Sequence, residues 1–255
     1  MTSPDPRRAT IFGQYADDYE RWRPTYFADA VDWLLPEGAA RVADVGAGTG
    51  KLTGLLLRRG LSVAAVEPDA GMLDVLRRSH PAADAHLAAA ESIPLPDASV
   101  DAVLAADAWH WVTPEAALRE ARRVLRPGGW LGLVWNSVAP LNAWEFDLAR
   151  LDPDHEGSES DVVVEQEPTA PGLEGERVET ATFPWTWEVS PDQWRSYLAT
   201  HSGYAVMDPA ERDRRLDAAR DVVTAACEQL GRSTAPVRHE AVCFRWRPQT
   251  TPDHG

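Results

Sequence analysis

Short β-rich runs alternate with helical runs between residues 41 and 135, and this alternation limits the fold more than any other feature of the sequence. Strands that alternate with helices form a parallel sheet with crossover helices on both faces. Ligands of such sheets bind at the carboxyl ends of the strands. The predicted strands lie at 41–45, 61–66, 85–88, 100–105 and 130–135. The predicted helices between them lie at 52–59, 70–79 and 114–125.

Further elements are predicted on both sides of this core. Before it, apolar and aromatic residues spaced by three and four predict a helix over 11–22, and Pro36 and Gly38 end a second predicted helix over 26–35. After it, a polar, Glu- and Gly-rich passage at 152–176 is expected to include a mobile loop. The last predicted strand is expected to join the sheet antiparallel. The elements predicted beyond residue 140 are helices at 142–151, 191–200 and 209–230 and strands at 178–189 and 240–246.

Composition and charge narrow the class of protein. At 255 residues, with 44% hydrophobic and 25% charged residues, the chain fits one α/β domain with appended pieces. A formal net charge of -15 repels nucleic-acid phosphates, so we expect a small-molecule substrate and no nucleic-acid partner. No apolar run approaches the roughly 20 residues that cross a bilayer, which predicts no membrane partner. Cys227 and Cys243 lack a CxxC spacing and the histidines lack an HxxxH spacing, so we expect a reducing cytoplasm and no metal.

The first predicted strand ends in a glycine-rich turn. Asp44 stands before the turn, and Gly46, Gly48 and Gly50 form a GxGxG pattern that lets a ligand approach the backbone closely. Dinucleotide sites usually read GxGxxG and cradle a pyrophosphate. Here the third glycine comes one residue earlier, and the Asp44 carboxylate would repel a pyrophosphate. A nicotinamide-dependent oxidoreductase is therefore disfavoured, and stays a second hypothesis.

Glu67 comes directly after the second predicted strand, 21 residues after Gly46. A carboxylate at this strand end is placed to accept hydrogen bonds from both ribose hydroxyls of an adenosine. Alone, an acidic residue after a strand is more often a solvated turn residue. The glycine turn at this distance favours the ribose role.

Two later motifs complete the pattern. Residues 89–97 read AAESIPLPD before the fourth predicted strand, and residues 125–130 read LRPGGW before the fifth. With the glycine turn and Glu67, they resemble the class I S-adenosylmethionine-dependent methyltransferases, in the branch with a generic small-molecule methyltransferase domain. The resemblance extends to residues 12–24, similar to a helix that relatives fold over the cofactor, and to a His-Trp pair at 110–111.

The resemblance implies a fold and an activity. The fold is a Rossmann-like, doubly wound α/β fold with a mostly parallel seven-stranded sheet, an antiparallel last strand and an N-terminal helical lid. The activity is an EC 2.1.1-type transfer of the methyl group of S-adenosyl-L-methionine to a small organic molecule. Separately from the resemblance, we expect a monomer or homodimer. The expected parts are a lead with lid helices at 1–37, a cofactor-binding core at 38–140 and a substrate-side region at 141–255 that completes the same sheet.

The resemblance also implies which residues contact the cofactor. Asp44 and the backbone of residues 46–50 would hold the methionine portion, and Glu67 the ribose. The full implied set is Tyr19, Arg23, Asp44, Gly46, Ala47, Gly48, Thr49, Gly50, Glu67, Pro68, Met72, Ala90, Glu91 and Asp107.

The adenine part of this set departs from the family pattern. By the resemblance, Pro68 and Met72 face the adenine, and Ala90 with Glu91 borders its edge. Relatives often carry a polar residue where Ala89 stands. The side-chain contact to the adenine amine is therefore expected to be absent or shifted to Glu91.

Tyr15 and His110 are the candidate catalytic residues. Tyr15, Tyr19 and Arg23 belong to the predicted lid, where a tyrosine would lie near the sulfonium and the arginine would pair with the cofactor carboxylate. The alternative is that the lid helix packs its aromatic stripe on the core. His110 either removes a proton from an oxygen or nitrogen nucleophile or forms part of the pocket wall.

Several tryptophans fall near the elements expected around the methyl acceptor. They either form an aromatic cage for a flat, apolar or cationic acceptor or pack in the core and lid. A third hypothesis is a cofactor-binding protein that no longer transfers a methyl group. The tryptophans concerned are Trp109, Trp111, Trp135, Trp185 and Trp187.

Overall fold

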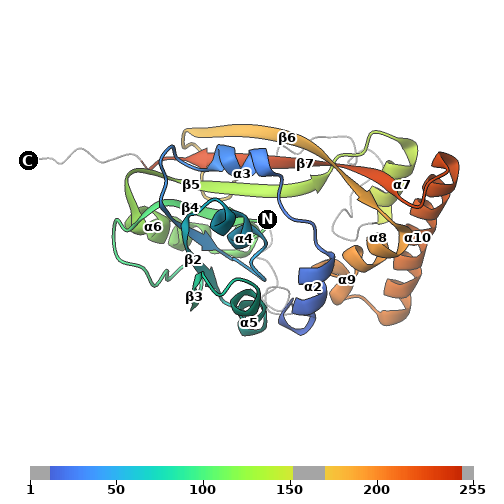
Figure 1. The fold of residues 1–255 in the computed structure, drawn as a ribbon, viewed down its shortest axis with the longest axis horizontal. Coiled ribbons are helices and arrows are strands. Elements are labelled where there is room, and N and C mark those ends of the chain that lie inside the picture. Colours follow the sequence, from blue (N-terminus) through green and yellow to red (C-terminus); the bar gives the residue numbers. More distant parts are fainter. Residues whose placement is uncertain (1–11, 152–169, 249–255) are drawn as a thin grey trace, which may run out of the picture. The chain divides into compact units, whose positions relative to one another are not determined.

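A computed structural model of the chain describes residues 12–151 and 170–248. It contains a seven-stranded sheet with the order β3-β2-β1-β4-β5-β7-β6 (Figure 1). The strands are β1 (Arg41–Val45), β2 (Ser62–Glu67), β3 (Asp84–Leu87), β4 (Val100–Ala106), β5 (Leu125–Val138), β6 (Val178–Val189) and β7 (Ala235–Trp246). The first five strands pair in parallel, while β7 is antiparallel to β5 and to β6. The predicted mostly parallel sheet with an antiparallel last strand is thereby confirmed.

The helices lie close to the predicted ranges. The α-helices are α2 (Ala16–Trp22), α3 (Ala28–Leu34), α4 (Lys51–Arg58), α5 (Ala70–Ser79), α6 (Pro114–Val124), α7 (Ala143–Leu151), α8 (Pro191–Leu198), α9 (Ser202–Ala205) and α10 (Pro209–Leu230). Two 3₁₀ turns, η1 (Phe12–Tyr15) and η2 (Trp109–Trp111), accompany them. Neither η2 nor α9 was predicted, because elements of three or four residues are too short to show a periodicity. The N-terminal lead and most of the passage at 152–176 lie outside the described residues.

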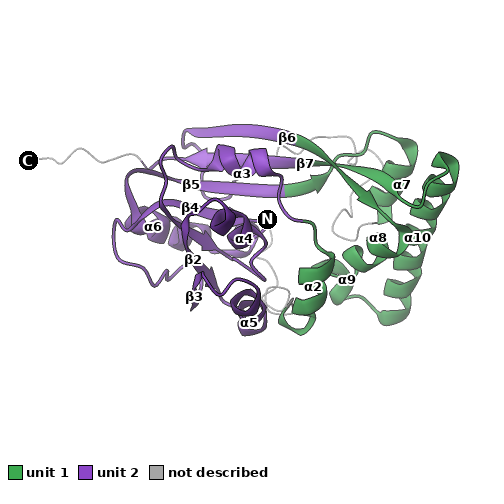
Figure 2. Ribbon diagram, in the orientation of Figure 1, with its two compact units in different colours: residues 1–24, 136–169, 184–240 green, residues 25–135, 170–183, 241–255 purple. Residues whose placement is uncertain are grey.

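The chain forms two compact units (Figure 2). Unit 1 comprises residues 1–24, 136–169 and 184–240, and unit 2 comprises residues 25–135, 170–183 and 241–255. None of the described helices is long and apolar enough to cross a membrane.

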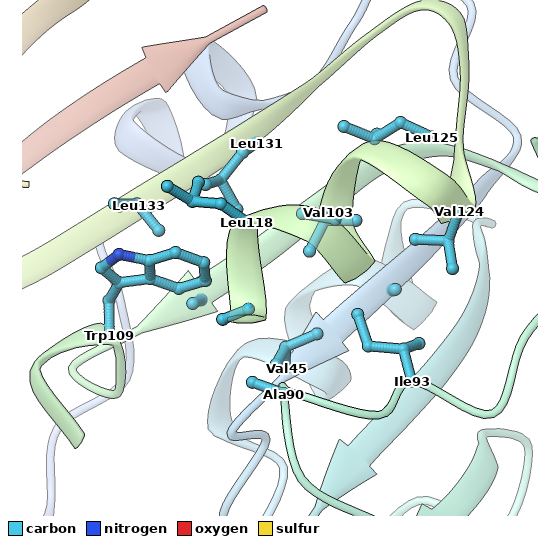
Figure 3. Close-up of a cluster of buried hydrophobic side chains, with 14 of the residues drawn as sticks. Val45, Ala90, Ile93, Val103, Trp109, Leu118, Val124, Leu125, Leu131 and Leu133 are labelled. Atoms are coloured by element: carbon cyan, nitrogen blue, oxygen red, sulfur yellow. The ribbon is translucent and has the colours of Figure 1, made fainter. Parts of the chain in front are cut away.

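Unit 2 buries both faces of its parallel strands. On one face, Leu118 of α6 packs with Val45 of β1 and Val103 of β4 in a large apolar cluster (Figure 3). On the other face, Leu76 of α5 packs with Ala65 of β2. Because neighbouring residues of a strand point to opposite faces, nearly every position of these strands is apolar. This packing leaves the strand ends as the positions for polar side chains.

Unit 1 has an apolar core of its own. Trp194 of α8 and Tyr204 of α9 are buried with Val223 of α10. Val189 of β6 and Val237 of β7 complete the cluster from the strand side. The helices α8, α9 and α10 therefore share one core with the strands β6 and β7.

The start of β5 differs from its prediction. β5 begins at Leu125, whereas the sequence predicted a helix to Leu125 and a strand from Trp130. Leu125 pairs with Val100 and Trp130 with Ala102, so residues 126–129 form a bulge opposite a single residue of β4. The glycines of the LRPGGW motif permit this bulge, because a Cβ on Gly129 would lie 2.6 Å from the carbonyl oxygen of Asp101.

Candidate functional site

Hydrogen bonds to the neighbouring strand β2 hold the glycine turn after β1 in place. The amide groups of Gly46 and Ala47 both donate to the carbonyl oxygen of Val66, at 2.8 and 3.2 Å. Gly46 has a φ of 67° and would place a Cβ 2.5 Å from the Cβ of Ala108, so any side chain there is both strained and in steric conflict with Ala108. Gly48 also has a positive φ, of 56°, but a Cβ added there meets nothing within 4 Å. The turn is therefore tightly packed at Gly46 and open at Gly48.

Glu67 lies beside this turn at the end of β2. The amide of Gly48 donates to Oε2 and the amide of Asp69 donates to Oε1, each at 2.8 Å. The side chain is only 7% exposed. Burial raises the pKa of Glu67 to about 7, and the two amide bonds only partly oppose this rise. The carboxylate is thus fixed in place while each oxygen keeps a further lone pair for a ligand.

Asp44 is buried beneath the turn. Its Oδ2 accepts a hydrogen bond of 2.5 Å from the hydroxyl of Thr53 on α4. No described residue gives its Oδ1 a hydrogen-bond partner. Burial raises the pKa of Asp44 to about 6. A buried acceptor without a partner is uncommon in native structures and needs an explanation.

Asp107 follows β4 in a strained conformation. Its φ is 49°, in the left-handed region that a residue other than glycine rarely adopts. Its amide donates to the carbonyl oxygen of Val134 at 2.9 Å, and its Oδ2 accepts from the hydroxyl of Tyr26 at 3.1 Å. Strain of this kind persists where surrounding structure enforces it, often at functional sites. No spacing in the sequence pointed to Tyr26, because 81 residues separate it from Asp107.

The residues predicted around the adenine occupy two segments of unit 2. Met72 is buried in the first turn of α5, where its amide donates to Oδ1 of Asp69, while Pro68 is exposed. Ala90 is buried, and Oε1 of Glu91 accepts a 2.6 Å hydrogen bond from the amide of Thr113. Glu91 therefore already ties its segment to the start of α6.

A basic residue that the sequence analysis missed anchors the segment after Glu91. The guanidinium of Arg123 donates to the carbonyl oxygens of Ile93 and Leu95, each at 2.7 Å. It also forms ion pairs with Asp97 and Glu120. The spacing of Glu120 and Arg123 on one helix was visible in the sequence, but the carbonyl partners lie about 30 residues away.

His110 is exposed in the short turn η2. Nε1 of Trp135 donates to its Nδ1 at 3.3 Å, and the ring of Trp111 lies 4.8 Å away, centroid to centroid. Trp109 is buried in the core (Figure 3), and its Nε1 donates to the carbonyl oxygen of Pro171. Three of the five tryptophans considered for an acceptor cage therefore lie in unit 2. Trp109 is a core residue, and Trp111 and Trp135 are neighbours of His110.

The predicted lid residues belong to unit 1. The guanidinium of Arg23 lies 5.0 Å from the ring centre of Tyr19 and 5.4 Å from that of Tyr197. Its Nε donates to the hydroxyl of Thr200 at 2.9 Å. Tyr15 is exposed where α2 begins. Trp185 and Trp187, the other two cage candidates, also lie in unit 1.

Unit 2 brings together most of the predicted cofactor residues at the carboxyl ends of neighbouring strands. In the strand order these ends belong to β2, β1 and β4. They carry Glu67, the glycine turn and Asp107, respectively. A sheet of this kind binds ligands at these ends.

Comparison with known proteins identifies the family. A family model described as "Methyltransferase domain" matches residues 43–133. A Mycobacterium tuberculosis (strain H37Rv) protein described as an uncharacterized methyltransferase is 43% identical over 235 residues, covering 92% of this chain and 94% of that protein. The chain belongs to the class I S-adenosylmethionine-dependent methyltransferases. The predicted family, fold and enzyme class are thereby confirmed.

The methyltransferase also shares its fold with solved structures. A candidate type II methyltransferase from Anaeromyxobacter dehalogenans superposes with a TM-score of 0.62 at 24% identity, covering 88% of this chain and 96% of the other. A candidate methyltransferase of an antibiotic biosynthesis pathway in Anabaena variabilis superposes with a TM-score of 0.60 at 22% identity, covering 87% and 96%. At these identities the likeness concerns the fold.

Proposed function

We propose that this methyltransferase binds S-adenosylmethionine on unit 2 and transfers its methyl group to a small organic acceptor. The observation that carries the proposal is the pair of amide hydrogen bonds that fix Glu67 beside the glycine turn. The ionised form of a carboxylate held in this way, which predominates above the pKa of about 7, accepts hydrogen bonds from two adjacent hydroxyls of a ribose. The net charge of -15 supports a small acceptor over a nucleic acid.

The residues around the turn fit such a ligand. The partnerless Oδ1 of buried Asp44 suits an ammonium group, such as that of a methionine portion, which supplies donors and a compensating charge. The open space at Gly48 suits a ligand that lies directly on the backbone. In this proposal Met72 and Ala90 form apolar contacts with the adenine.

Glu91 has a structural role in addition to the one that the resemblance implied. Since its Oε1 accepts from the amide of Thr113, the carboxylate supports the start of α6 while its other oxygen stays available as an acceptor. Ala89 offers no polar group to an adenine amine. We therefore assign recognition of the adenine edge to Glu91 and the backbone of its segment.

When bound, S-adenosylmethionine supplies a methyl group that its sulfonium already activates. The chain then has to hold the acceptor in line and exclude water. Tyr15, Tyr19 and Arg23 lie in unit 1, and their contact with the ligand stays a prediction of the family resemblance. Within unit 1, Tyr19 and Thr200 restrict the guanidinium of Arg23.

His110 is better suited to orient the acceptor than to deprotonate it. An indole N–H can only donate, so Nδ1 of His110 accepts from Trp135 and the neutral ring carries its proton on Nε2. The Nε2–H group then donates a hydrogen bond. We assign His110 the pocket-wall role, as a donor to the acceptor molecule.

Two measurements test the proposed function. Calorimetry of the purified chain is expected to detect binding of S-adenosylmethionine and not of NADH. Incubation with methyl-labelled S-adenosylmethionine and fractionated host extract is expected to yield a small molecule that gains one methyl group by mass spectrometry. Tight NADH binding alone would favour the oxidoreductase hypothesis. Cofactor binding with no methylated product in any fraction would favour a binding protein without methyl transfer.

A further inference from the structure

The imidazole of His80 lies against the start of α4. A Cβ added to Gly50 would lie 2.5 Å from Cδ2 of this ring, and a Cβ added to Gly54 would lie 2.5 Å from its Cε1. The ring therefore occupies the space that side chains at both positions would need. His80 is the C-cap residue of α5, so its half-buried side chain connects the end of α5 to the beginning of α4.

The two glycines that contact His80 differ in what their backbone requires. Gly50 has a φ of 95°, in the left-handed region that favours glycine whatever its neighbours are. Gly54 lies inside α4, where glycine is among the poorest helix formers and alanine is the best. The helix backbone thus gives no reason for a glycine at position 54. The contact with the imidazole gives one, because it leaves no room for a methyl group.

The contact falls on the first turn of α4. The amide of Gly54 donates to the carbonyl oxygen of Gly50 at 2.8 Å, and the amide of Gly50 donates to the carbonyl oxygen of Ala47 at 2.9 Å. These two hydrogen bonds connect the helix directly to the glycine turn at 46–50. The imidazole packs against both residues of the first bond, so its position affects the geometry of the turn that follows from the second.

The end of α5 supports the glycine turn at a second point. Leu76 precedes His80 by four residues, which places it one helical turn away on the same side of α5. Leu76 is buried against Ala47, and its Cγ would lie 3.0 Å from a Cβ on Gly50. Gly48, whose backbone we assign to the cofactor, lies between these two supported positions.

We propose that His80 is a positioning residue that orders the glycine turn for S-adenosylmethionine. This role rests on the proposed function, since it concerns the same cofactor site. His80 acts through Gly50 and Gly54 and is assigned no contact with the ligand. A turn that already has its binding conformation does not have to be ordered during binding, which favours affinity. Without the imidazole, the free turn samples further conformations, and the binding-competent fraction falls.

Two variants remove the contact in different ways. His80→Ala deletes the imidazole, and Gly54→Ala displaces it, because the added Cβ takes its place. Calorimetry is expected to show about tenfold weaker S-adenosylmethionine binding in each, which corresponds to ordering the backbone of roughly one residue. The double variant is expected to lose no more affinity than the weaker-binding single variant, because both changes break one contact. Additive losses would show that the two residues act independently, and they overturn the proposal.

The order of the free turn separates positioning from stability alone. Without ligand, ¹⁵N relaxation is expected to report lower order parameters for the amides of Gly48 and Gly50 in His80→Ala. Val124→Ala removes apolar volume from the core of unit 2, so it is expected to lower the urea midpoint but to leave these order parameters and the cofactor affinity unchanged. Ser79→Ala changes an exposed neighbour of His80 and is expected to change neither. Unchanged order parameters in His80→Ala overturn the proposal.

Failure of this role and failure of the proposed function give different results. If the unmodified chain does not bind S-adenosylmethionine, the proposed function fails, and the role of His80 fails with it. If the unmodified chain and both folded single variants bind the cofactor equally well, only the role of His80 is overturned. Gly54→Ala decides the matter if His80→Ala does not fold, because it keeps every atom of the imidazole.

Discussion

Nε1 of Trp135 donates a hydrogen bond to Nδ1 of His110 across 3.3 Å. This pairing selects one tautomer of a side chain that is exposed and close to the strand ends of the candidate site. Because an indole has no acceptor, the bond holds only while Nδ1 lacks a proton. A protonated His110 must therefore give up its contact with Trp135.

The first prediction concerns this tautomer. In the unmodified chain at pH 8, ¹⁵N NMR is expected to report His110 as the Nε2–H form. Trp135→Phe removes the donor, so the ¹⁵N shifts of His110 are expected to move toward the average of both tautomers. Trp111→Phe removes the neighbouring ring but not the hydrogen bond, and is expected to leave the tautomer unchanged. An Nδ1–H form in the unmodified chain would contradict the assignment.

The second prediction concerns Asp44 and pH. Its pKa is raised from 3.8 to about 6, so the stability that protonated Asp44 provides is lost as pH rises through about 6. Since one pKa unit corresponds to about 1.4 kcal/mol, this loss is about 3 kcal/mol at most. Asp44→Asn is expected to unfold at a higher urea concentration than the unmodified chain at pH 7.5, with the difference shrinking toward pH 4.

The same variant separates stability from binding. Asparagine removes the buried charge that we assign to the ammonium group of the cofactor, so Asp44→Asn is expected to bind S-adenosylmethionine at least tenfold more weakly. Thr53→Val provides the matched comparison, because it removes the hydrogen bond to Oδ2 and keeps the charge. If Asp44→Asn binds the cofactor normally, Asp44 does not belong to the site.

The third prediction concerns Glu67. Glu67→Ala is expected to weaken S-adenosylmethionine binding by about 1 to 3 kcal/mol, the range for hydrogen bonds to a charged group. Calorimetry measures this change directly. Asp74→Ala alters an exposed carboxylate of α5 and is expected to have no effect. Unchanged affinity in Glu67→Ala would remove Glu67 from the proposed ribose contact.

The fourth prediction compares glycines that all have positive φ values. Gly46→Ala adds both backbone strain and a clash with Ala108, so it is expected to lose more unfolding free energy than Gly48→Ala or Gly60→Ala. The last two have open space and are expected to lose about 1 kcal/mol each from backbone strain. Cofactor affinity separates them, because only Gly48 belongs to the proposed site. Equal affinity in Gly48→Ala and Gly60→Ala would argue against a ligand on that backbone.

Much of the fold could be predicted because the signals are local. β1, α5, β6 and α10 have the same bounds in the structure as in the sequence prediction. Their periodicity, the glycine after α10 and the prolines at helix starts act within a few residues. The bulge at 126–129 escaped prediction because its register is set by pairing with β4, which no local pattern encodes.

The same distinction between local sequence signals and tertiary contacts applies to the candidate site. Sequence alone determined the order of strands and helices, the glycine turn and the position of Glu67, because spacing along a parallel α/β chain fixes which residues reach the strand ends. Only the tertiary structure decided what each side chain contacts. Folding brings together segments that share no local pattern. It places Thr53 next to Asp44, Trp135 next to His110, and three tryptophans around His239. Burial, which sets the pKa values of Asp44 and His239, is likewise a property of the packed core and not of the sequence near them.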